Sequence, residues 1–150
     1  MALQQDITAA IKAAMKAKDS LKLEALRAVK SAILLEQTSG AGAEELTEYQ
    51  EIKLLQKLVK QRKDSATIFR EQNRTDLAEP EEAQAEIIQA FLPAQLSEAE
   101  IEAAVKGIIA QMGASGMQDM GKVMGKASQE LAGKADGKTI STIVKAKLMA

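Results

Sequence analysis

Apolar residues recur every three or four positions along almost the whole chain, which is the spacing of one buried face of an α-helix. The first two stripes are Leu3, Ile7, Ile11 and Ala14, and then Leu23, Leu26, Val29, the methylene stem of Lys30 and Ile33. Asp19 or Ser20 can cap the second of these helices. No stretch alternates apolar and polar residues in the manner of a β-strand, so the pattern predicts an all-α fold.

Small and polar residues at 38–43 interrupt this pattern and predict a flexible loop. Thr47 and Gln50 then form a capping box, so we expect a third helix to begin there. If it is helical through Gln72 it is about 39 Å long at 1.5 Å per residue, which makes it the longest element. Its stripe is Ile52, Leu55, Leu58 or Val59, Arg62, Ala66 and Phe69.

A fourth helix is predicted after a polar connection at residues 73–76. We expect Pro80 at its first position or within its first turn, because proline has no N–H to donate and its φ suits a helix start. Glu81 and Glu82 follow, where acidic side chains interact favourably with the helix dipole. The apolar positions of this helix are Ala83, Ile87, Ile88 and Phe91.

Pro93 marks the clearest boundary in the chain, because a proline disfavours helical geometry in the residue before it. Ser97 and Glu100 form a second capping box immediately afterwards, which starts a new helix. We therefore predict two domains: a four-helix unit with one long helix at 1–92, and a three-helix bundle at 93–150.

Glycines delimit the three helices predicted after this boundary. The fifth helix ends at Gly113, the sixth runs to about Leu131 with Gly133 as its stop, and the seventh follows Asp136 and Gly137. The positions expected to be buried are Ile101, Val105, Ile108 and Met112 in the fifth helix, and Ile140, Ile143, Val144 and Leu148 in the seventh.

Composition excludes several classes of chemistry. The 150 residues include no cysteine, histidine or tryptophan, so disulfides, thiolate nucleophiles and histidine acid–base catalysis are absent. Twenty basic and twenty-one acidic side chains give a net charge of −1, so no overall field attracts DNA or anionic membranes. No apolar run is long enough to span a bilayer and no secretory signal is recognisable, so we expect a cytoplasmic protein.

Charge is nevertheless concentrated near the end of the chain, where seven lysines against three acidic residues leave residues 104–150 with a balance of +4. Four Gly-Lys pairs lie in this stretch: Gly121-Lys122, Gly125-Lys126, Gly133-Lys134 and Gly137-Lys138. On a helical wheel Lys122 and Lys126 point away from the apolar stripe, with Gly121 and Gly125 on the flank. A bare helix flank beside two lysines allows a bulky anionic backbone to approach closely.

The turn that follows adds lysines, and it exposes amides at the start of the last helix, where phosphate binds favourably. An alternative interpretation gives this stretch no function. The glycines would then allow a neighbouring helix to pack closely, and the lysines would be ordinary solvated surface.

Several segments, in order along essentially the whole chain, resemble the GatB/YqeY domain family. These segments are Asp76-Leu77-Ala78, Phe91-Leu92-Pro93-Ala94-Gln95-Leu96-Ser97, Met120-Gly121-Lys122-Val123-Met124, Gly133-Lys134-Ala135-Asp136-Gly137-Lys138 and Val144-Lys145. The family comprises small free-standing bacterial proteins similar to the tail of the B subunit of glutamyl/aspartyl-tRNA amidotransferase, a helical appendage regarded as tRNA-binding. The resemblance implies an all-helical, two-part fold. It also implies tRNA contact through Gly121, Lys122, Lys126, Lys134, Asp136, Gly137, Lys138 and Lys145.

Three hypotheses about function follow. In the first, the chain is a helper that binds tRNA and works with an amidotransferase or an aminoacyl-tRNA synthetase. Tyr49, Phe69 and Phe91 are too few, and expected to be too buried, to stack unpaired bases, so binding would depend on the shape of folded RNA.

In the second hypothesis, the chain is a component of a carbon–nitrogen ligase with glutamine as amido-N-donor. We identify no catalytic residue, metal ligand or cofactor site for this reaction. The acidic residues Glu79, Glu81 and Glu82 are read as helix-start acids rather than as metal ligands.

In the third hypothesis, the long helix is a protein-interaction face without RNA binding. Its candidate residues are Lys57, Lys60, Arg62, Lys63 and Arg70. A solvated helix laced with charges is the favoured interpretation of that face.

Overall fold

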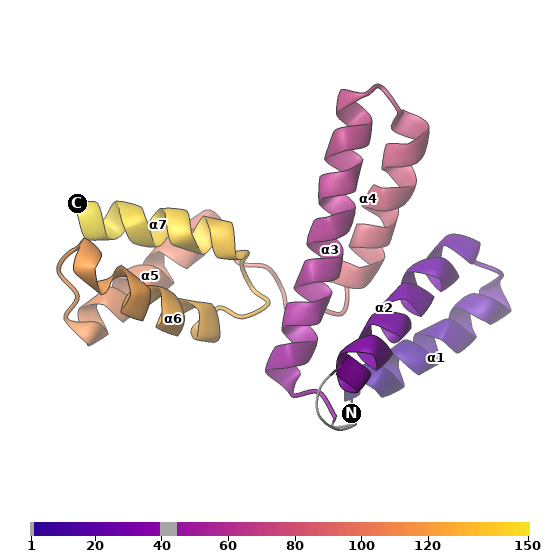
Figure 1. Ribbon diagram of the computed structural model, residues 1–150, viewed down its shortest axis with the longest axis horizontal. Coiled ribbons are helices and arrows are strands. Elements are labelled where there is room, and N and C mark those ends of the chain that lie inside the picture. Colours follow the sequence, from indigo (N-terminus) through magenta and orange to yellow (C-terminus); the bar gives the residue numbers. More distant parts are fainter. Residues whose placement is uncertain (1, 40–44) are drawn as a thin grey trace. The chain divides into compact units, whose positions relative to one another are not determined.

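The computed structural model describes residues 2–39 and 45–150, and all regular structure in these residues is helical (Figure 1). The prediction of an all-α fold is therefore confirmed for the described chain. The chain divides into two compact units, Met1–Leu92 and Pro93–Ala150, which we call the first and the second unit.

In the first unit the described residues form the helices α1 (Ala2–Ala17), α2 (Ser20–Ser39), α3 (Glu48–Glu71) and α4 (Thr75–Gln89). Helices α3 and α4 pack side by side, as do α1 and α2, and α2 also contacts α4 (Figure 1). The residues buried most completely at their shared core are Ile7, Leu26, Val29, Leu55 and Ile88. Each of these helices contributes residues to this core.

The predicted helix starts in this unit depend on side-chain caps. Asp19 caps α2, because its Oδ1 accepts a hydrogen bond from the backbone N–H of Lys22 at 3.1 Å. The capping box at α3 is confirmed, since Thr47 and Gln50 bond each other's backbone N–H groups at 2.8 and 3.2 Å. Lys30 is exposed, so the expectation that its stem joins the buried stripe of α2 is wrong.

The predicted loop at 38–43 begins too early. Thr38 and Ser39 belong to α2, and their hydroxyls donate to backbone carbonyls one turn back, Thr38 to Leu34 at 3.0 Å and Ser39 to Glu36 at 3.0 Å. These bonds satisfy the polar side chains inside the helix, which is why the composition was misleading. Residues 40–43 lie outside the described residues.

Helix α4 begins five residues before Pro80, at Thr75, so the expectation that proline opens this helix is wrong. Pro80 lies inside the helix, where it cannot donate a bond to the Asp76 carbonyl. The preceding turn forms because it buries Ala78, which is 0% exposed, while the proline ring faces solvent. Burial of the first turn therefore outweighs the backbone bond that proline removes.

One buried carboxylate in the first unit has an oxygen that accepts no hydrogen bond from the described residues. Glu51 is 7% exposed, and its Oε2 accepts no hydrogen bond in the described structure. Burial raises the pKa of Glu51 above its ordinary value, the N-terminal amine opposes this rise, and Glu48 and Glu45 add to it. A charged Glu51 at neutral pH is thus expected to destabilise the fold.

Replacing Glu51 with glutamine should increase the free energy of unfolding at pH 7 by about 1 kcal/mol. A raised folded-state pKa favours folding below the ordinary glutamate pKa, and this contribution disappears as pH rises through the folded value. The gain from Glu51→Gln should therefore shrink between pH 7 and about pH 4. Urea unfolding, monitored by circular dichroism at each pH, measures this difference in the free energy of unfolding. Glu48→Gln, an exposed neighbour in the same turn, is the control and should show no such gain.

The second unit contains α5 (Glu98–Met112), a short 3₁₀ turn η1 (Met117–Asp119), α6 (Met120–Glu130) and α7 (Gly137–Met149). The capping box of Ser97 and Glu100 is confirmed, and α5 ends at Gly113, whose φ of 63° lies in the left-handed region. All four positions predicted to be buried in α7 are buried. Met112 is 37% exposed in the last turn of α5, so its predicted burial is wrong; Ile109 and Ala114 pack against the core at this end of the helix instead.

Candidate functional site

The core of the second unit fixes which face of α6 meets solvent. Val105 from α5, Val123 from α6 and Val144 from α7 are all 0% exposed and belong to one cluster. Because Val123 and Ala127 are buried one turn apart, the opposite face of α6 must point outwards. That outward face carries the first two predicted site lysines.

The two lysines of α6 differ in their surroundings. Lys122 is exposed and has no hydrogen-bond or ion-pair partner among the described residues. Lys126 is half-buried, donates to the Gln111 Oε1 at 3.3 Å and lies 3.9 Å from a Glu130 carboxylate oxygen. Lys122 therefore offers an uncompensated charge, whereas the charge of Lys126 is partly balanced within the unit.

Gly121 and Gly125 form an open flank of α6 beside these lysines. Both are exposed, and a Cβ atom added to either would meet no atom within 4 Å. The interpretation that they allow a neighbouring helix to pack closely is therefore excluded for the described chain. Gly125, inside α6, still weakens the helix by about 1 kcal/mol relative to alanine, and Gly121, in its first turn, by less, with no packing gain inside the fold.

The loop between α6 and α7 holds the next group of predicted residues. Lys134, Gly137 and Lys138 are exposed, and Gly137 is the first residue of α7. Asp136 caps α7, because its Oδ1 accepts from the Thr139 backbone N–H at 2.7 Å and its Oδ2 from the Thr139 hydroxyl at 3.0 Å. This carboxylate already occupies the helix start, and its negative charge works against the expected binding of phosphate at those amides.

A segment distant in sequence fixes this loop. The Leu96 backbone N–H donates to the Lys134 carbonyl at 2.8 Å, and the Gln95 side-chain amide donates to the Gly133 carbonyl at 2.5 Å. Gly133 itself has a φ of 77°, which favours glycine. Two of the segments that carry the resemblance, residues 91–97 and 133–138, thus contact each other, and Gln95 is a positioning residue that sequence reasoning missed. A single sequence carries no signal for that pairing.

Two of the seven lysines after residue 104 share one carboxylate outside the predicted site. Lys106 and Lys147 both form ion pairs with Glu102, with Lys106 Nζ 3.7 Å from the carboxylate. The hydrogen bond from Lys147 lowers the pKa of Glu102, and the charges of both lysines add to this effect. Neither lysine belongs to the predicted site.

The remaining predicted residues lie along α6, its following loop and α7. Lys122 and Lys126 are one helical turn apart, and Gly121 and Gly125 have the same spacing. Lys145 is exposed and lies seven residues after Lys138, on the same side of α7. It stays a prediction that these side chains form one continuous binding surface.

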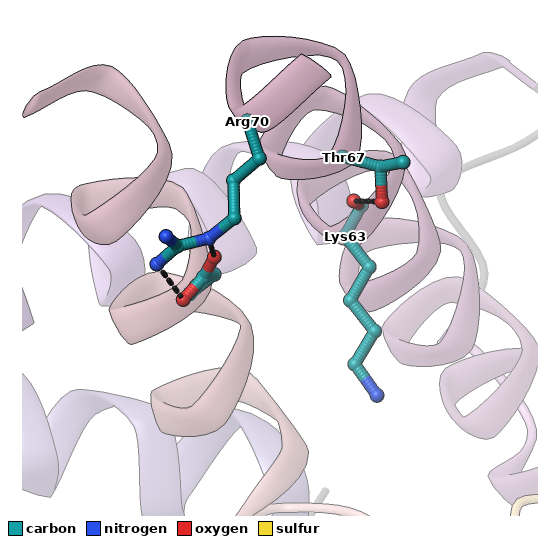
Figure 2. Close-up of polar contacts among 4 residues, drawn as sticks. Lys63, Thr67 and Arg70 are labelled. Atoms are coloured by element: carbon teal, nitrogen blue, oxygen red, sulfur yellow. Dashed lines mark hydrogen bonds and ion pairs between the residues drawn. The ribbon is translucent and has the colours of Figure 1, made fainter. Parts of the chain in front are cut away.

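Three cations of the proposed α3 interaction face point instead to α4. Arg62 Nε donates to Gln84 Oε1 at 3.1 Å, and Lys63 Nζ donates to Gln89 Oε1 at 3.3 Å. Figure 2 shows the third contact, in which the Arg70 guanidinium donates two bonds to the Glu82 carboxylate. These groups connect the two helices, and sequence alone cannot identify the helix that receives them.

The same contact changes the interpretation of Glu82. It lies in the middle of α4 rather than at its start, and the hydrogen bond from Arg70 lowers its pKa. No group of three or more acidic residues is positioned to hold a metal ion in the described ranges.

The expectation that the aromatic residues are buried holds only in part. Phe69 and Phe91 are partly buried, but Tyr49 is 45% exposed in the first turn of α3. The Lys53 ammonium lies 5.4 Å from the centroid of the Tyr49 ring, within cation–π range.

Among the described helices, none is long and apolar enough to cross a membrane.

Comparison with known proteins gives a family match over most of the chain. The family described as "Yqey-like protein" matches residues 4–148. Two curated relatives are named "Altered inheritance of mitochondria protein 41, mitochondrial": one from Lachancea thermotolerans, 40% identical over 68% of this chain, and one from Clavispora lusitaniae, 40% identical over 61%. The aligned regions span 55% and 52% of those two proteins, so the chain corresponds to only part of each.

A third relative, from Thermococcus gammatolerans, is named as one of the subunits of a glutamyl-tRNA(Gln) amidotransferase. It is 37% identical over 46% of this chain, and the aligned region is 12% of its own length. The similarity is therefore confined to a small part of that protein.

Proposed function

The chain belongs to the Yqey-like protein family, and from this premise we propose that it binds tRNA as an accessory of tRNA-dependent amidation. The observation that carries the proposal is the open glycine flank of α6 beside Lys122. Helix-weakening glycines with no packing role inside the fold are explained if an external backbone approaches them closely. The similarity to an amidotransferase component supports tRNA as the source of that backbone.

The proposed contacts divide into two roles. Lys122, Lys126, Lys134, Lys138 and Lys145 neutralise phosphates, while Gly121, Gly125 and Gly137 leave room for the sugar–phosphate chain. Asp136 does not contact phosphate in this scheme; it caps α7 and so fixes the lysine-bearing loop. This surface offers no aromatic side chain, so it recognises the shape of folded RNA.

We further propose that the two units are separate domains, with the N-terminal helical domain at 1–92 and the GatB/YqeY-type domain at 93–150. The RNA contacts above all lie in the second of these. The first unit has its own core, formed by four helices, and it leaves part of α3 exposed for other contacts.

An amidotransferase or an aminoacyl-tRNA synthetase is the protein partner that fits this proposal. The Thermococcus gammatolerans relative favours the amidotransferase. The cytoplasmic location stays a prediction, and the relatives from Lachancea thermotolerans and Clavispora lusitaniae are mitochondrial by name.

The proposal predicts a salt-dependent affinity for tRNA. Neutralising about four phosphates should give a slope of log K against log salt near −3 to −4, with the duplex coefficient as a guide. Filter binding of the purified chain to unfractionated tRNA across a series of KCl concentrations measures this slope. Binding that is absent at the lowest salt, or insensitive to salt, would contradict the proposal.

A further inference from the structure

The solvent face of α3 carries a row of lysines that the proposed function does not use. Lys53, Lys57 and Lys60 are all exposed, and their spacing of four and three residues places them on one side of the helix. At 1.5 Å per residue they are separated by about 6 and 4.5 Å along the axis. The opposite side of α3 is buried through Leu55 and Val59.

Acidic residues are missing from this part of the helix. Residues 52–63 contain five basic side chains and no acidic one. Lys53 and Lys57 have no carboxylate partner within the described part of the chain, and Lys60 has only a solvent-exposed pair with Asp64 at 3.4 Å. Like charges one turn apart work against the helix, whereas Lys106 and Lys126 each lie one turn from a glutamate.

An aromatic ring begins the same row. Tyr49 lies four residues before Lys53, is 45% exposed, and has the Lys53 ammonium 5.4 Å from its ring centroid. The cation–π contact places a positive charge over the ring of this solvent-exposed residue. An accessible ring followed by regularly spaced cations is typical of surfaces that bind single-stranded nucleic acid.

We propose that this row, Tyr49, Lys53, Lys57 and Lys60, binds an unpaired stretch of RNA, with the lysines at successive phosphates and a base stacked on Tyr49. The inference rests on the proposed function in taking RNA as the ligand, but it assigns a second site, in the other unit. An acidic peptide would use the lysines and leave the tyrosine ring without a role, which is why RNA is favoured.

The lysines are tested with a fluorescein-labelled oligouridylate and the full-length chain. In Lys53→Gln/Lys57→Gln/Lys60→Gln the salt slope of binding should fall by about 2, because each lost single-strand phosphate contact contributes about 0.7. The control variant Lys12→Gln/Lys16→Gln/Lys22→Gln removes the same charge from exposed positions of α1 and α2. It should keep the slope of the unmodified chain. Glutamine preserves helix propensity, and circular dichroism checks the helicity of both variants.

The ring is tested separately with Tyr49→Leu. Its affinity for the oligouridylate should fall about tenfold at every salt concentration, with the slope unchanged, because stacking rather than charge is lost. Poly-L-glutamate, a polyanion without bases, is used as a competitor and should displace the oligouridylate poorly.

Two results would overturn the inference. One is an equal change in slope in the lysine variant and its control. The other is unchanged affinity in Tyr49→Leu together with efficient displacement by polyglutamate, which would assign the row to an acidic peptide. Filter binding to tRNA by Lys122→Gln/Lys145→Gln separates this inference from the proposed function. If Lys122→Gln/Lys145→Gln loses affinity for RNA and the α3 variants do not, the α3 site alone is wrong. If the α3 variants lose affinity for RNA and Lys122→Gln/Lys145→Gln does not, the site in the second unit is wrong.

Discussion

Reversing the charges of Lys122 and Lys126 together should abolish retention of tRNA in a low-salt gel-shift assay. Each substitution to glutamate removes an attraction and adds a repulsion beside the open flank of Gly121 and Gly125. We expect affinity to fall by about a hundredfold or more, which corresponds to about 2.7 kcal/mol. Lys122→Glu alone should have the larger effect, since Lys126 is already paired with Glu130 and bonded to Gln111.

The control for this experiment is Lys12→Glu/Lys16→Glu. It makes the same change in charge at two exposed positions of α1. An equal loss in the control would show only that total charge matters, and unchanged retention in the α6 variant would remove the second unit as the tRNA site. Circular dichroism must show that both variants keep their helicity.

Much of the fold follows from short-range signals that the sequence displays openly. The capping boxes at Thr47 and Ser97 and the glycine stop at Gly113 each involve residues within one helical turn, and the structure contains all three. Pro80 is different, because its place inside α4 accompanies the complete burial of Ala78 in the preceding turn, which no local pattern reports. Tertiary burial outweighed the local preference there.

The candidate site likewise combines features that local sequence predicts with contacts that only the packing of the helices determines. The outward direction of Lys122 follows from helical periodicity, and so does the pairing of Lys126 with Glu130 four residues on, whereas the bond from Lys126 to Gln111 depends on the packing of α5. Gln95 and Gly133 meet across 38 residues of sequence, and a single chain carries no pattern that reports such a contact. The exposure of Tyr49 was likewise unpredictable, because an aromatic residue near a helix start packs inwards or outwards according to its neighbours.

The glycines of α6 allow a test in which stability and binding move in opposite directions. In Gly121→Ala/Gly125→Ala the added methyl groups meet no atom within 4 Å, so nothing in the fold should clash. Alanine is favoured over glycine inside a helix by about 1 kcal/mol, which applies to Gly125, and by less at Gly121 in the first turn of α6, so the free energy of unfolding should increase by about 1 to 2 kcal/mol. The same methyl groups occupy the space that we assign to the sugar–phosphate chain, so affinity for tRNA should fall.

Gly107→Ala is the matched control for that experiment, because Gly107 also lies inside a helix, α5, and a Cβ there also meets no atom within 4 Å. It should gain about 1 kcal/mol of stability and bind tRNA unchanged. Thermal unfolding gives the stability of each variant, and filter binding gives the affinity. A more stable α6 variant that binds tRNA as tightly as the unmodified chain would show that no external backbone approaches those glycines. The feature that carries the proposed function would then have no binding role.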